Sequence, residues 1–163
     1  MDPLILTARF DPETQGWLQE QRDRFFPADR NIVPAHLTLF HKLPGEELRA
    51  VEEAVEDAAD TLPVPARIAD VRFFGRGGAF VVRSEGLERV RADLAKQFGA
   101  WLGAQDRQGF RAHVTYQNKV TKAAAQRGYE TVLREFAPFD ATVTGLDLWW
   151  YRGGPWEAAH RTG

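Results

Sequence analysis

Residues 36–43 read His-Leu-Thr-Leu-Phe-His-Lys-Leu, an alternation of polar and apolar side chains that predicts a β-strand. Residues two apart on a strand point to the same side, so His36 and Thr38 are expected on one face and His41 on the other. The full expected face comprises His36, Thr38, Phe40 and Lys42. The following Pro44-Gly45 pair ends the strand. The stretch therefore predicts a strand that presents an imidazole and a hydroxyl side by side.

The same short pattern occurs again in the second half of the chain. Residues 34–39 (PAHLTL) resemble residues 111–116 (RAHVTY), and both contain His-x-Thr. Each copy is predicted on a strand that follows a polar loop and precedes a helix. We therefore expect two related halves, one carrying His36 with Thr38 and the other carrying His113 with Thr115.

The remaining pattern predicts alternating strands and helices. Further strands are expected at residues 3–10, 66–74, 78–84, 110–120 and 141–151, and helices at 12–26, 46–60, 85–102 and 121–136. Asp11 and Thr121 are the expected N-caps of the first and last helices. Gly75-Arg76-Gly77 predicts a hairpin turn, so the sheet is not purely parallel. These elements indicate an α+β or mixed α/β fold.

Composition narrows the class of protein. The chain has 163 residues, of which 44% are hydrophobic, enough for a single domain with a sizeable core. The absence of cysteine excludes disulfides, thiolate zinc sites and a cysteine nucleophile. A net charge of −2 gives no global attraction to a polyanion, so any contact with nucleic acid is expected to be local. No signal peptide or membrane span is predicted, and we expect a cytoplasmic protein.

The two His-Thr pairs together suggest acid–base chemistry at a phosphate. If the two halves bring the pairs to one cleft, one imidazole can accept a proton while the other donates one. The hydroxyls of Thr38 and Thr115 can donate hydrogen bonds to non-bridging phosphate oxygens. Such a site needs no metal. Ser84, the only serine, lies outside both motifs, which argues against a Ser-His-Asp hydrolase.

With both motifs in view, the sequence resembles the 2H phosphoesterase superfamily, and most closely its bacterial 2'-5' RNA ligase and RNA 2',3'-cyclic phosphodiesterase branch. The resemblance rests on His36-Leu37-Thr38, on His113-Val114-Thr115 and on the late strand that ends in Trp149-Trp150-Tyr151. It implies one domain over residues 1–163, built as two pseudo-symmetric lobes with antiparallel-rich sheets and a central cleft. It also implies that both histidines are catalytic and that both threonines bind the phosphate.

The activity implied by the resemblance is the opening of 2',3'-cyclic phosphates to 2'-phosphates, without metal or cofactor, with 2'-5' RNA ligation as the reverse reaction. The expected substrate is an RNA end or a small nucleotide, and the expected state is a monomer. Strand parity and the late aromatic strand suggest further substrate contacts from Phe40, Lys42, Arg111, Gln117, Lys119, Trp150 and Arg152. The alternative is a non-catalytic nucleotide- or RNA-binding module that keeps the same fold.

Overall fold

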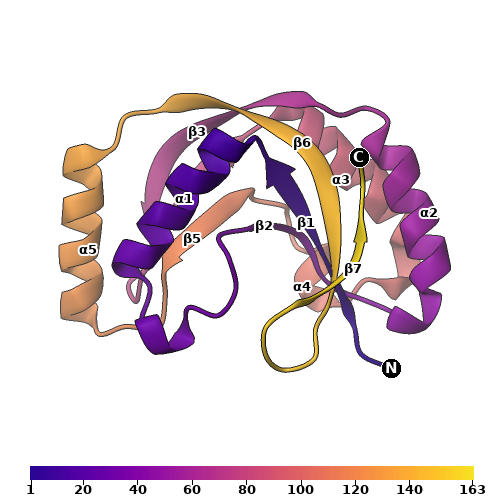
Figure 1. The fold of residues 1–163 in the computed structure, drawn as a ribbon, viewed down its shortest axis with the longest axis horizontal. Helices are drawn as coiled ribbons and strands as arrows, with labels where there is room; N and C mark the ends of the chain where they lie inside the picture. The colour runs from indigo at the N-terminus through magenta and orange to yellow at the C-terminus, as the bar shows by residue number, and fades with distance from the viewer.

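The computed structural model describes residues 1–163 as a mixture of helices and one antiparallel sheet (Figure 1). The strands are β1 (Leu4–Phe10), β2 (Leu37–Leu43), β3 (Val64–Phe73), β4 (Gly78–Arg83), β5 (His113–Gln117), β6 (Phe139–Trp150) and β7 (Glu157–Arg161). The helices are α1 (Pro12–Phe25), α2 (Leu48–Ala59), α3 (Glu85–Phe98), α4 (Ala104–Arg107) and α5 (Lys122–Glu135). Short 3-10 turns occupy Ala28–Arg30, Gly45–Glu47 and Gly99–Trp101.

The sheet topology divides the molecule into two lobes. The strand order is β2-β1-β6-β3-β4-β5, with β7 added beside β6, and neighbouring strands are antiparallel. The long strand β6 arches over the molecule, pairing with β1 along one part of its length and with β3 along the other (Figure 1). Helices α1 and α5 lie at one end of the view and α2 and α3 at the other. The predicted α+β, bilobal fold is confirmed.

The two outer strands of this order, β2 and β5, come back into contact, so the sheet is curved into a nearly closed barrel. Figure 1 shows them near the middle of the molecule, beneath the arch of β6. The two His-x-Thr motifs lie at the starts of these strands: His113 is the first residue of β5, and His36 immediately precedes β2. The curvature of the sheet therefore brings together two motifs that are far apart in the sequence.

Local sequence signals account for most element boundaries. Asp11 caps α1 by accepting from the Thr14 amide, and Thr121 caps α5 by accepting from the Ala124 amide, as predicted. The only serine caps α3: Ser84 accepts from the Leu87 amide and donates to the Pro65 carbonyl. This structural role leaves Ser84 no part in the site.

Four segments differ from prediction. Helix α3 ends at Phe98, well before residue 102, because Gly99 adopts a positive φ of 45°. The polar loop predicted over 103–109 contains the short helix α4, and the strand predicted over 110–120 is regular only at β5. The terminal segment forms a strand, β7, which pairs with β6.

None of the helices is long and apolar enough to cross a bilayer.

The alternation in β2 is interrupted by a β-bulge. Two consecutive residues of β1 pair with residues of β2 that are two apart, Leu6 with Phe40 and Thr7 with Thr38, so Leu39 is the extra residue. At the next two residues the faces of the strand exchange, and a second register shift follows before Leu43. Phe40 turns into the core and is 0% exposed, while His41 is exposed on the side of Thr38. The predicted parity of Phe40 and His41 is therefore wrong.

Candidate active site

The two motif histidines are anchored by the same hydrogen bond. His36 Nδ1 lies 2.7 Å from the carbonyl oxygen of Pro34, and His113 Nδ1 lies 2.7 Å from that of Arg111, in each case two residues earlier. A carbonyl only accepts, so each Nδ1 carries the proton and each neutral ring keeps a free lone pair on Nε2. The two halves thus present equivalent nitrogens for proton transfer.

Helix α1 holds the first motif in place. The backbone of Ala35, the residue before His36, is bonded on both sides: its amide donates to Gln19 Oε1 at 2.7 Å, and its carbonyl accepts from Gln15 Nε2 at 2.9 Å. Two amide side chains from successive turns of one helix therefore fix the path of the chain into His36. Positioning of this kind keeps the imidazole in a defined orientation.

The same helix ties the two motifs together through Arg22. Its Nη1 donates to the carbonyl of Thr115 in β5 at 3.0 Å, and its Nε donates to Asn31 Oδ1 in the segment before β2 at 3.2 Å. Arg22 is buried and its guanidinium also lies over the ring of Phe26. Burial lowers the pKa of Arg22, but the nearby Asp23 carboxylate opposes that shift. A single cation thus spans both halves of the site.

His36 lies in an environment that disfavours its charged form. The ring of Trp156 lies against the imidazole, with centroids 4.6 Å apart. Burial lowers the pKa of His36 to about 4 despite the opposing hydrogen bond to Pro34. The positive charges of Arg22, His113 and His41 lower it further, which also shows that the three histidines share one electrostatic neighbourhood. His36 is therefore neutral near pH 7 and suited to accept a proton.

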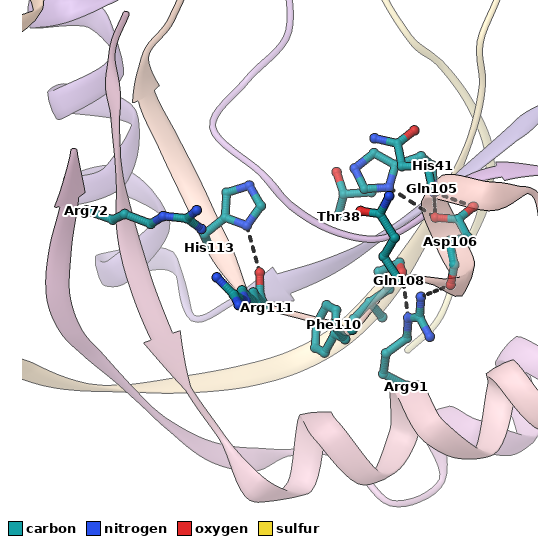
Figure 2. A pocket seen from close by; sticks show the side chains of 12 residues that line it. Thr38, His41, Arg72, Arg91, Gln105, Asp106, Gln108, Phe110, Arg111 and His113 are labelled. Carbon is teal, nitrogen blue, oxygen red and sulfur yellow. Dashed lines mark hydrogen bonds and ion pairs between the residues drawn. The ribbon is translucent and has the colours of Figure 1, made fainter. Parts of the chain in front are cut away.

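A cavity of about 540 Å³ lies beside the second motif. Figure 2 shows His113, Arg72 and Arg111 on one side of it and His41, Gln105 and Gln108 on the other. Its lining comprises Thr38, Leu39, His41, Arg72, Arg91, Gln105, Asp106, Gln108, Gly109, Phe110, Arg111 and His113. His36 lines a smaller hollow of about 250 Å³ together with Trp149 and Trp156. The cavity is polar and basic even though the whole chain is slightly acidic.

A His–Asp pair in this cavity was not predicted from the sequence. His41 Nδ1 lies 3.0 Å from Asp106 Oδ1, and the same carboxylate accepts from the backbone amides of His41 and Lys42. Burial would raise the pKa of Asp106, but these hydrogen bonds outweigh it and hold the pKa below the ordinary value. The adjacent apolar pair Leu39-Phe40 is the one signal in the sequence that marks the bulge and so places His41 on this face.

A family model described as the 2'-5' RNA ligase superfamily matches residues 10–155, nearly the whole chain. The chain belongs to the 2'-5' RNA ligase superfamily. No match was found among curated proteins.

Solved structures resemble this superfamily member over almost its full length. TT0787 of Thermus thermophilus has 21% identity and a TM-score of 0.66, with 98% of this chain and 96% of that chain covered. E. coli LigT complexed with 3'-AMP has 17% identity and a TM-score of 0.58, with the same coverage of 98% and 96%. LigT complexed with NADP+ has 17% identity and a TM-score of 0.56, again covering 98% and 96%. At these identities the likeness establishes the fold.

In this member of the superfamily, the predicted site residues lie in different hollows around the two motif strands. Thr38, Arg111 and His113 line the larger cavity, whereas His36 lines the smaller hollow and Thr115 lines neither. Thr115 is half-buried two residues into β5, where its carbonyl accepts from Arg22. The two motifs are therefore brought to one region of the molecule.

The other predicted contacts lie elsewhere. Phe40 is excluded from substrate contact because the bulge turns its ring into the core against Phe98. Gln117 is buried, and its Nε2 donates to the carbonyl of Phe25. Lys119 follows the end of β5 with a φ of 59°. Phe40 and Gln117 are buried at register shifts in β2 and β5, and Lys119 lies beyond the end of β5, so strand parity does not place these three side chains.

The three remaining predicted residues line other hollows. Lys42 lines a separate hollow, together with Leu43 and Trp101. Trp150 and Arg152 lie beside residues 45–50, where Arg152 pairs with the carboxylates of Asp2 and Glu157. Arg152 also lies 5.1 Å from the centre of the Trp150 ring. The late aromatic strand therefore serves packing and surface ion pairs at this end.

Proposed function

We propose that the protein is a metal-independent phosphodiesterase that opens 2',3'-cyclic phosphates of RNA ends or nucleotides to 2'-phosphates. The observation that supports this most is the matched anchoring of His36 and His113, which leaves an Nε2 on each ring for proton transfer. Membership of the 2'-5' RNA ligase superfamily and the nucleotide-bound LigT structures are consistent with it. We further propose that the chain acts as a monomer, with one motif supplied by each lobe.

The proposed reaction is an in-line displacement by water. His36, neutral because of its lowered pKa, accepts a proton from the attacking water as the new P–O bond forms. The bond from phosphorus to the 3'-oxygen breaks, and His113 in its charged form gives its proton to that oxygen. The product carries a 2'-phosphate and a free 3'-hydroxyl. With the 5'-hydroxyl of a second RNA end in place of water, the same displacement would break the bond from phosphorus to the 3'-oxygen and join the two ends through a 2'-5' bond.

The first test is turnover in the presence of a chelator. We expect the protein to convert adenosine 2',3'-cyclic phosphate to 2'-AMP at the same rate before and after dialysis against EDTA, with the product identified by 31P NMR. Loss of activity on chelation, restored by a divalent cation, would overturn the mechanism because a metal-bound water would then supply the nucleophile. Binding of the nucleotide with no turnover would favour a non-catalytic binding module.

The second test concerns the motif hydroxyls. Thr38→Val and Thr115→Val should each lower kcat/KM by roughly 10–150-fold, the cost of about 1.5–3 kcal/mol for a lost hydrogen bond to a charged group. Valine keeps the shape while removing the donor. Thr131→Val is the matched control, since that hydroxyl donates to the Arg127 carbonyl within α5, away from both motifs. Normal activity combined with lower melting temperatures in the motif variants would show a purely structural role.

A further inference from the structure

The pair formed by His41 and Asp106 has no part in the two-histidine mechanism. The Asp106 side chain is only 2% exposed, whereas that of His41 is 42% exposed and lines the cavity. An ionised carboxylate only accepts, so His41 Nδ1 carries the proton that faces Asp106 and Nε2 is left for a ligand. A buried acid that orients an exposed imidazole is an arrangement suited to binding or proton transfer.

Asp106 is itself held in position by Arg91. Arg91 Nη2 donates to the Asp106 carbonyl at 2.7 Å, and its Nε donates to the Leu39 carbonyl at 2.8 Å. Arg91 is buried, so its guanidinium serves to fasten α4 to the bulge of β2. The bulge, the arginine and α4 together set the direction of the His41 ring.

The charge around His41 favours an anionic ligand. Asp106 is the only acidic residue that lines the cavity, and its oxygens are already taken by the His41 ring and two backbone amides. The exposed side chains of Arg72 and Arg111 lie on the opposite side of the cavity from His41 (Figure 2). Gln105 and Gln108 lie on the His41 side, and Phe110 lies below them, nearer to Arg111. The cavity thus combines cations with amides and an aromatic ring, as expected for a nucleotide rather than for inorganic phosphate alone.

The width of the cavity separates His41 from His113. Both histidines line it, and Figure 2 shows them on opposite sides. A nucleoside can lie between these two walls. The volume of about 540 Å³ also exceeds what one phosphate group needs.

We propose that His41, oriented by Asp106, binds a second phosphate of the substrate: the 3'-5' diester that precedes the terminal nucleotide of an RNA chain. An imidazolium between the Asp106 carboxylate and this phosphate would make a charge-assisted hydrogen bond from each ring nitrogen. The inference rests on the proposed function and narrows it, because it makes an RNA end the preferred substrate over a mononucleoside cyclic phosphate.

The kinetic test compares two substrates with the same reactive end. We expect the dinucleotide ApA with a 2',3'-cyclic phosphate to have a kcat/KM about 10–100-fold above that of adenosine 2',3'-cyclic phosphate, the range for a hydrogen bond to a charged group. In His41→Asn this preference should fall to near unity, mainly through a higher KM for the dinucleotide. His160→Asn is the matched control, because His160 also pairs with a carboxylate, that of Glu56, but lines none of the hollows around the motifs.

A binding measurement separates the two proposals. Calorimetry should show that the wild type binds adenosine 3',5'-bisphosphate more tightly than 3'-AMP. The His41→Asn variant should bind the two ligands with equal affinity. If neither cyclic substrate turns over but this difference is present and abolished by the substitution, the proposed reaction fails and the phosphate subsite stands. Equal kcat/KM for both substrates in an active wild type, or an undiminished preference in both His41→Asn and His41→Gln, would overturn the subsite.

Discussion

Replacing either motif histidine by alanine should lower turnover of a 2',3'-cyclic nucleotide by roughly 10²–10⁴-fold, the usual contribution of a general acid or base. His36→Ala removes the proton acceptor and His113→Ala removes the donor, while the threonines still hold the phosphate. The loss should therefore appear in kcat, with a smaller effect on KM. Steady-state kinetics on the purified variants measures both quantities.

The double variant makes this test more specific. His36 and His113 act in one step, so removing both should cost little more than removing the more important one. His113 is exposed and contributes little packing, and its variant should keep the wild-type melting temperature. His160→Ala, which removes an imidazole outside the cavity, should keep full activity. Full activity in both motif variants would refute the assignment.

Much of the fold is encoded in short-range signals. The caps at Asp11 and Thr121 and the hairpin through Gly75 depend on residues close in sequence, and each is formed as predicted. The pairing of the motifs was also accessible, because a repeated His-x-Thr on two strands indicates two related halves. These features depend on local backbone geometry and on the alternation of side chains between the two faces of a strand.

The substrate contacts could not be placed in the same way. Strand parity holds only while a strand stays regular, and the extra residue at Leu39 exchanges the faces of β2 at Phe40 and His41, before a second register shift precedes Leu43. The bulge removes Phe40 from the site and brings His41 into it. Asp106, far away in the sequence, is then needed to orient the ring. A contact between β2 and a one-turn helix has no periodic signature in either segment.

The acid limb of the pH profile of kcat/KM should lie at an unusually low pH. This parameter reports the free enzyme, in which burial lowers the pKa of His36 to about 4. A base is active when neutral, so activity should persist as the pH falls and be lost only near pH 4. At pH ~5 the neutral fraction is about 30-fold greater than for an unperturbed histidine of pKa ~6.5. Circular dichroism at each pH distinguishes protonation of the site from acid unfolding.

The limb in kcat should lie at higher pH than the limb in kcat/KM. A bound phosphodiester is negatively charged and stabilises the imidazolium, which opposes the effect of burial and of the neighbouring positive groups Arg22, His113 and His41. The alkaline limb should reflect loss of the proton from the acid, and in the complex both limbs belong to the coupled pair. Separate profiles of the two kinetic parameters over roughly pH 4–9 measure this difference.

Trp156→Ala tests the cause of the shift. Removing the indole admits water to the His36 ring, so the acid limb of kcat/KM should move up from about 4 towards 6.5. Trp101→Ala is the control, since Trp101 stacks on Phe98 and lines a different hollow. If the wild-type limb lay near 6.5 and Trp156→Ala left it there, His36 would not be the desolvated base. The base would then have to be His113, with His36 required in its charged form, and the direction of proton transfer across the phosphate would be the reverse of the one proposed.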